Sequence, residues 1–141
     1  MEYHFRIHRE GRGYWAECVE LKGCVTQADT RASLDANMKE ALDLYMDEPA
    51  DSRVVFPAPR KRVSGQNVVL VQVDPKIAFA QTLRSLRLGK RLTQRQVADR
   101  LGMKNLYSYQ RLESARTANP ALSTIAKLKS VFPELKLDQV V

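Results

Sequence analysis

The fold of the first half is decided by one stretch, YHFRIHREGRGYWAECVEL, at residues 3–21. Its first part alternates, with Tyr3, Phe5 and Ile7 on one face and polar side chains between them. This period of two is typical of a β-strand. A Gly-Arg-Gly turn follows, and the residues after the turn are again rich in aromatic and branched side chains. The stretch therefore predicts a β-hairpin.

The sequence around this hairpin predicts a small α+β domain. Residues 24–27 predict a short third strand, and Asp29 or Thr30 can cap a helix that ends near residue 48. A run of branched apolar residues at 68–73 predicts a last strand. The order β-β-β-α-β places one helix on one face of the sheet. The other face of the sheet, or one of its edges, is then either polar and exposed to solvent, or it binds a partner or a second copy of the chain.

The charge of the chain is unevenly distributed. The 141 residues hold 23 Lys and Arg against 16 Asp and Glu, a net charge of +7. Residues 1–75 have a net charge of −2, whereas residues 76–141 have a net charge of +9. We therefore expect two domains, 1–75 and 76–141, of which the second has the charge of a nucleic-acid binder.

The basic half is predicted to be helical throughout, and its first amphipathic helix carries Ile77, Ala80 and Leu83 on one face. Thr93 and Gln96 have the spacing of a capping box, and Gly102 ends the short helix that the box begins. A third helix is expected over residues 105–114, with Tyr109 and Leu112 in the core. Two short helices joined by a glycine-containing turn predict a helix-turn-helix.

A fourth helix is expected behind this motif. Asn119 is a suitable cap and Pro120 a suitable first helical residue. Leu122, Ile125 and Leu128 would then face the core at helical spacing.

The helix-turn-helix predicts a set of DNA contacts. Polar side chains early in its second helix reach base edges, while basic side chains and the start of its first helix contact phosphates. The pattern Leu-Thr-Gln…Val-Ala…Leu-Gly, followed by Asn-Pro, resembles the Xre/Cro-type repressor domain, with one extra residue in the turn. The predicted DNA-binding residues are Gln94, Lys104, Asn105, Tyr107, Ser108, Gln110, Arg111 and Arg116.

The first half resembles the HicB antitoxin family. The resemblance rests on GYWAECVELKGCVTQADT at residues 13–30 and on the later NMKEAL at residues 37–42. It implies a degenerate RNase H-like domain that binds and neutralises a small basic HicA-type RNase toxin. It also implies a homodimer or larger homo-oligomer that represses its own operon by binding double-stranded operator DNA. The toxin would contact the exposed sheet face and edges, for which the candidates are Trp15, Glu17 and Glu20.

Neither an active site nor a metal or cofactor site is predicted. Glu17 and Glu20 lie three apart on a strand and would point to opposite faces, so they cannot share a metal ion. Cys18 and Cys24 are expected to be small core residues, and both histidines are expected at the surface. The chain is therefore expected to be a non-enzymatic protein of the reducing cytoplasm, with no membrane span and no signal peptide.

Two functional hypotheses remain open at this point. In the first, the chain is an antitoxin whose sheet binds a toxin and whose helical half binds an operator. In the second, it is a stand-alone transcriptional repressor whose first half dimerises or senses a ligand. A neighbouring reading frame that encodes a small basic protein with a histidine would favour the first hypothesis.

Overall fold

The computed structural model describes residues 1–141 and shows an α+β protein with a four-stranded antiparallel sheet and five α-helices. The chain divides into two compact units. The first comprises Met1–Met46 and Phe56–Asp74, and the second Asp47–Val55 and Pro75–Val141. None of the helices is both long and apolar enough to cross a bilayer.

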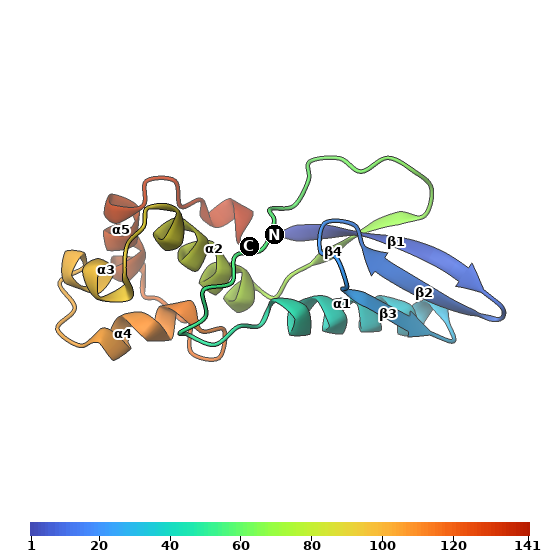
Figure 1. Cartoon of the computed structure of the whole chain (residues 1–141), viewed down its shortest axis with the longest axis horizontal. Helices are drawn as coiled ribbons and strands as arrows, with labels where there is room; N and C mark the ends of the chain where they lie inside the picture. The colour runs from blue at the N-terminus through green and yellow to red at the C-terminus, as the bar shows by residue number, and fades with distance from the viewer. The chain divides into compact units, whose positions relative to one another are not determined.

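The first unit has the predicted element order β-β-β-α-β (Figure 1). The strands stand in the order β3-β2-β1-β4, so β1 and β2 are central and β3 and β4 form the edges. Its elements are β1 (Glu2–Glu10), β2 (Gly13–Cys18), β3 (Val25–Ala28), α1 (Arg31–Met46) and β4 (Val68–Gln72).

The core of the first unit lies between α1 and one face of the sheet. Tyr3, Phe5 and Ile7 are buried, which confirms the alternation predicted for β1. Figure 1 shows α1 running along this one face of the sheet. Thr30 caps the helix as expected, because its Oγ1 accepts a hydrogen bond from the backbone N–H of Ser33 at 3.1 Å. The residues that α1 buries are Leu34, Met38, Leu42 and Met46.

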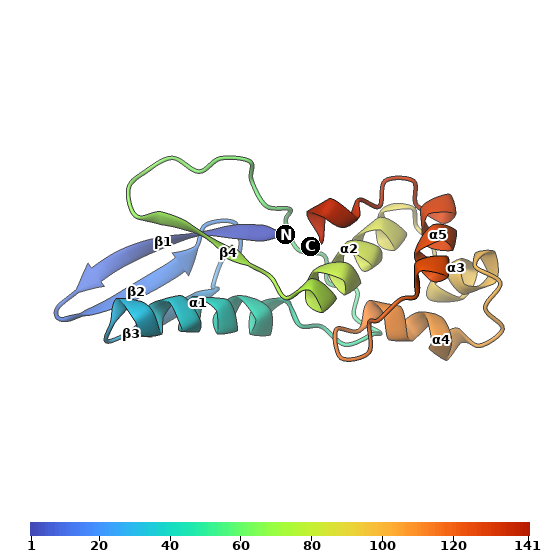
Figure 2. The ribbon, with the colours of Figure 1, turned by 180° about the vertical axis from the view of Figure 1, so that it is seen from behind.

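A long connection joins α1 to the last strand, β4, which runs antiparallel to β1. Figure 2 shows the green part of this connection as a loop that leads into β4. Two side chains of β1 tie this loop to the sheet: Tyr3 Oη donates to the carbonyl of Pro57 at 2.7 Å and Arg6 Nη2 to that of Ser64 at 3.0 Å.

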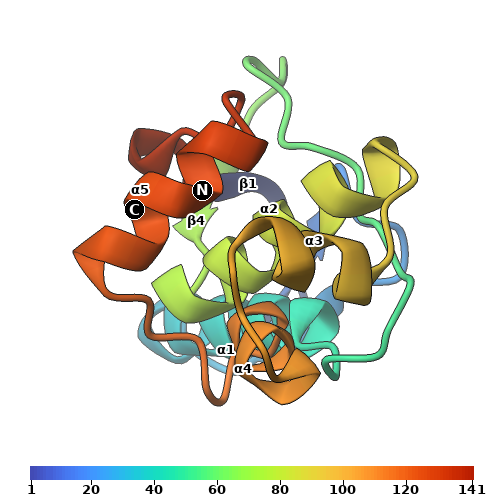
Figure 3. The same ribbon diagram turned by 90° about the vertical axis from the view of Figure 1, so that its left-hand side faces the viewer.

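The second unit is helical, as its sequence predicts (Figure 3). Its four α-helices alternate with turns, and two short 3₁₀ turns, η1 and η2, follow α4 and α5. The elements are α2 (Pro75–Gly89), α3 (Gln94–Arg100), α4 (Leu106–Gln110), η1 (Arg111–Glu113), α5 (Leu122–Val131) and η2 (Leu137–Gln139).

The start of α3 is the capping box that the sequence predicts. Thr93 Oγ1 accepts from the N–H of Gln96 at 3.1 Å, and the Gln96 side chain accepts from the N–H of Thr93 at 2.8 Å. Tyr109 and Leu112 are buried, as expected. The predicted third helix is divided, however, because α4 ends at Gln110 and the chain continues as η1.

The predicted start of the fourth helix is wrong. Residues after η1 are held in a turn, in which the carbonyl of Ser114 accepts from the N–H groups of Thr117 and Ala118. The chain therefore becomes helical only after Ala121, which caps α5 without a side-chain hydrogen bond. Leu122 consequently faces solvent with 84% of its surface exposed, instead of facing the core.

Residues 47–55 pack with the second unit, although the sequence analysis places them with the first. Arg84 Nη2 donates to the carbonyl of Pro49 at 2.7 Å, and Gln94 Nε2 donates to that of Ala50 at 2.6 Å. This short segment contains three acidic residues and one basic residue. The negative charge of residues 1–75 therefore belongs to it, so the first unit is neutral and the second has a net charge of +7.

Candidate functional sites: a helical basic surface and an open sheet face

The helix α4 and the start of η1 present a group of exposed polar side chains. Tyr107 has 57% of its surface exposed, and Ser108 and Arg111 are exposed beside it. The guanidinium carbon of Arg111 lies 5.7 Å from the centroid of the Tyr107 ring, a cation–π distance. These three side chains are therefore available to a ligand at the surface.

Asn105 has a structural role at this surface. It is the N-cap of α4, and its side-chain oxygen accepts from the backbone N–H of Tyr107 at 2.9 Å. Its side-chain amide nitrogen makes no hydrogen bond in the structure, so only this half of the side chain is left for an external contact. The sequence places Asn105 at a helix start but does not reveal this capping bond.

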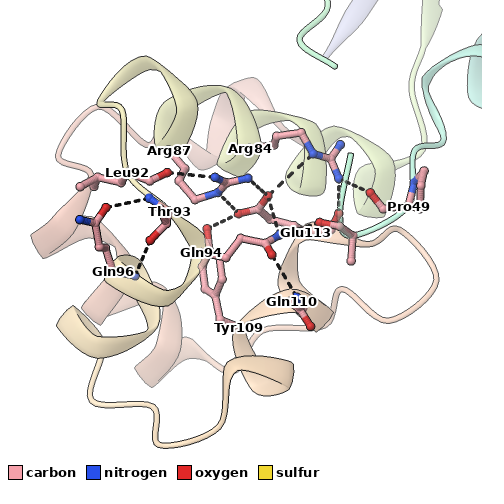
Figure 4. A network of polar contacts seen from close by, with 11 residues as sticks. Pro49, Arg84, Arg87, Leu92, Thr93, Gln94, Gln96, Tyr109, Gln110 and Glu113 are labelled. Carbon is pink, nitrogen blue, oxygen red and sulfur yellow. Dashed lines mark hydrogen bonds and ion pairs between the residues drawn. The ribbon is translucent and has the colours of Figure 1, made fainter. Parts of the chain in front are cut away.

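Two other predicted DNA-binding residues contact each other. Gln110 Nε2 donates to Gln94 Oε1 at 3.1 Å, and Gln94 Nε2 is engaged by the carbonyl of Ala50 at 2.6 Å (Figure 4). Both glutamines are half-buried. They join the first residue of α3 to the last residue of α4, so both side chains help to position these two helices.

The remaining predicted contacts, Lys104 and Arg116, are exposed and form no ion pair. Arg95 and Arg100 on α3 are exposed and unpaired as well. Unneutralised basic side chains at the surface attract polyanions such as a phosphate backbone.

Beneath this surface lies a buried polar cluster that the sequence analysis missed. Glu113 is 0% exposed, and Arg87 binds it with two hydrogen bonds, Nε to Oε2 at 2.6 Å and Nη2 to Oε1 at 2.9 Å (Figure 4). Tyr109 donates its hydroxyl to the same carboxylate. Arg84 Nη2 donates to the Glu113 backbone carbonyl at 2.7 Å. One feature of the sequence could have revealed this cluster: Arg84 and Arg87 lie three residues apart on the apolar face of one helix.

Burial shifts the proton affinities in this cluster. It raises the pKa of Tyr109 far above its ordinary range, and the Glu113 carboxylate adds to that rise. Burial lowers the pKa of Arg84, against the opposing effect of Glu113. For Arg87, burial acts in the same downward direction and is the largest single effect, but the hydrogen bonds and charge of Glu113, together with Tyr109, outweigh it and the pKa is raised. The cluster thus links α2, α4 and η1 through buried, charge-assisted bonds.

The sheet face opposite α1 carries an aromatic pair. His8 and Trp15 are cross-strand neighbours, and their rings stack with centroids 4.1 Å apart. Glu17 lies two residues along β2 on the same face, with Oε1 3.5 Å from Nε2 of His8. Trp15 and Glu17 are half-buried, so both retain accessible surface as the sequence analysis expects.

Glu20 does not lie on that exposed face, and this expectation is wrong. The strand β2 ends at Cys18, so the alternation does not extend to Glu20. Its buried carboxylate accepts from the backbone N–H groups of His4 and Arg60, both at 3.0 Å. The His4 ring Nδ1 lies 2.9 Å from Oε2. His4 is therefore a buried residue rather than a surface histidine.

The two cysteines are buried free thiols, as expected. Burial raises the pKa of both, and that of Cys24 rises to about 12. Nowhere in the chain do three or more His, Cys, Asp or Glu side chains gather in a way that would hold a metal ion.

Comparison with known proteins finds a relative for about half of the chain. A UPF0150 protein of Helicobacter pylori (strain J99 / ATCC 700824) is 32% identical over 74 residues, which is 52% of this chain and 92% of the relative. No protein-family model matches the chain.

Proposed function

The chain belongs to the UPF0150 protein family, and on this premise we propose that it is a HicB-type antitoxin that neutralises a HicA-type RNase toxin and represses its own operon. UPF0150 proteins are generally HicB-like. The similarity extends over 74 residues, about the size of one of the two units. The resemblance of residues 13–42 to HicB supports the same assignment.

The observation that carries the proposal is the joining of two chemically unlike units. One is a neutral sheet unit with an open aromatic face, and the other is a helical unit with a net charge of +7. A single-purpose protein has no need of this division. A protein that binds a protein partner with one unit and DNA with the other accounts for both.

In the proposed function the open sheet face binds the toxin. Aromatic side chains with a rigid position are common at the energetic centres of protein interfaces, and Trp15 is held in place by its stack on His8. Glu17 supplies a negative charge that favours a basic partner. Glu20 supports this unit from inside and is not part of the proposed contact surface.

The helical unit is proposed to bind operator DNA as a helix-turn-helix of the Xre/Cro type. In this assignment α3 approaches the backbone and α4 enters the major groove. Tyr107, Ser108 and Arg111 are proposed to reach base edges or phosphates, and Lys104 and Arg116 to contact phosphates. Gln94 and Gln110 are assigned mainly to fixing α3 against α4, because they already bind each other.

The sheet unit is proposed to be a degenerate, non-catalytic RNase H-like domain. Its element order β-β-β-α-β agrees with this assignment. In this chain β4 runs antiparallel to β1. A two-metal nuclease needs several converging carboxylates. Here the Glu20 carboxylate is occupied by His4 and Arg60, while Glu17 lies on the surface.

The experiment that tests the proposal uses the small basic protein encoded by the adjacent reading frame. The two proteins should co-purify after co-expression, and this chain should abolish the growth arrest that the small protein causes alone. The complex should also bind the operon's own promoter fragment in a mobility-shift assay. Promoter binding with neither co-purification nor protection would instead support a stand-alone repressor.

A further inference from the structure

The outer edge of β4, on the side away from β1, pairs with no other strand of the chain. The ladder between β1 and β4 uses alternate residues, as shown by the hydrogen bond from the N–H of Ile7 to the carbonyl of Asn67 at 2.9 Å. Because antiparallel ladders alternate, the N–H and C=O groups of Val68 and Leu70 point away from β1. No hydrogen bond engages them in the structure.

This edge lacks the features by which proteins protect unpaired strands. Charged side chains, prolines and bulges normally interrupt such an edge. The five residues of β4, VVLVQ, include neither a charge nor a proline. Leu70 also has 55% of its surface exposed. The edge therefore combines open backbone groups with an apolar, uncharged side-chain surface.

The opposite edge, β3, is shorter and partly protected. It has only four residues, of sequence VTQA. The outward carbonyl of Gln27 already accepts a hydrogen bond from Nδ2 of Asn37 on α1 at 2.9 Å. An additional strand at this edge would have to displace that bond, so the two edges of the sheet are not equivalent.

We infer that β4 pairs with β4 of a second copy of this chain around a two-fold axis. An antiparallel pair of identical strands satisfies two-fold symmetry. With Val69 at the axis, Val68 of each copy lies opposite Leu70 of the other, and the outward groups form about four hydrogen bonds. The two sheets then continue as one eight-stranded sheet. The absence of charge on β4 suits a copy of itself, because no like charges are brought together.

This interface would supply the dimer that operator binding needs, because a dimer reads two half-sites. The role in operator binding rests on the proposed function, whereas the interface itself does not. The oligomeric state is therefore measured without DNA first. Sedimentation equilibrium should show a dimer of the full chain. Leu70→Lys places two ammonium groups at the shared edge and should raise the dimer dissociation constant about tenfold or more.

Val25→Lys is the matched control. Val25 lies on the other edge strand with 56% of its surface exposed, nearly the same as Leu70, so the added charge is equivalent. This variant should remain as dimeric as the wild type. A monomeric wild type, or equal loss of dimer in both variants, would overturn the inference. Circular dichroism establishes that both variants are folded.

Hydrogen exchange provides a second measurement that does not depend on a mutation. The amides of Val68 and Leu70 have no acceptor within one chain, so they should be protected only at concentrations where the dimer forms. Fast exchange of both amides in a dimeric sample would place the interface elsewhere. Mobility shifts with operator DNA are then measured separately. A Leu70→Lys monomer that binds operator as tightly as the wild type would refute the use of the dimer in operator binding, and not the interface.

Discussion

Arg87 and Glu113 form a bidentate ion pair inside the helical unit, with side-chain exposures of 6% and 0%. Removing one member of such a pair leaves the other charge buried without compensation. Because Arg84 and Tyr109 also contact Glu113, the loss affects every element that the cluster joins. The pair is thus the main polar support beneath α4.

Glu113→Ala should lower the free energy of unfolding of the helical unit by about 3–5 kcal/mol. The measurement is urea unfolding followed by circular dichroism, since the single tryptophan, Trp15, lies in the other unit and does not report on these helices. Glu134→Ala is the control, because Glu134 forms only an exposed pair with Lys90. That variant should unfold like the wild type. Similar losses in both variants would contradict the role of the cluster.

Asn105→Ala should destabilise the helical unit by about 1 kcal/mol and weaken operator binding, because it removes the cap of α4. Asn105→Ser retains a capping oxygen and should restore stability. If Asn105 acts only as the cap, serine also restores operator affinity. If its free amide nitrogen also reads a base, Asn105→Ser remains stable but binds the operator weakly. Thermal unfolding and mobility shifts of the two variants separate these roles.

Arg111→Ala should weaken operator binding and reduce the slope of log K against log salt by about 1, as expected for a lost phosphate contact. Binding of the partner protein should be unchanged, because Arg111 lies in the helical unit. Lys127→Ala, an exposed substitution on α5, serves as the control and should leave operator affinity close to that of the wild type. Equal loss of operator and partner binding in Arg111→Ala would show that the two units do not act separately.

Glu17 and Glu20 should respond differently to substitution, although only two residues separate them. Glu17→Ala should weaken partner binding without changing the stability of the sheet unit. Glu20→Ala should destabilise that unit by about 1–3 kcal/mol for each buried donor left without an acceptor. Trp15 fluorescence during urea unfolding measures the stability, and titration calorimetry measures the binding. A stable Glu20→Ala variant with weakened partner binding would place Glu20 in the interface after all.

The stability of the sheet unit should decrease at alkaline pH because of Cys24. Its pKa is raised by burial from 9.0 to about 12 in the folded chain, so the folded state retains a proton that the unfolded state loses. This contribution is complete below pH 9.0 and is lost as the pH rises toward about 12. The expected slope is about −1.4 kcal/mol per pH unit for this group. Cys24→Ser should remove that part of the slope in urea unfolding at several pH values, whereas an unchanged slope would assign it to other groups.

Local features of the sequence predicted most of the secondary structure. The alternation of Tyr3, Phe5 and Ile7 and the capping box of Thr93 and Gln96 are each set by residues a few positions apart, so they can be found without a three-dimensional structure. The same reasoning identified Tyr107, Ser108 and Arg111 as exposed side chains, which the structure places on α4 and at the start of η1. It failed at Asn119, because the chain becomes helical only after Ala121 although Asn119 is a good capping residue.

By itself, then, the sequence determined the order of the elements, the basic character of the helical half and the positions of its exposed side chains. Only the tertiary structure decided that residues 47–55 join the helical unit, that Glu20 and Glu113 are buried and that β4 is an open edge. Each of these depends on partners far apart in the sequence, such as Glu20 with His4 or Arg87 with Glu113. No local pattern encodes such a pairing, because burial of a charge is favourable only once the complementary group has been brought beside it.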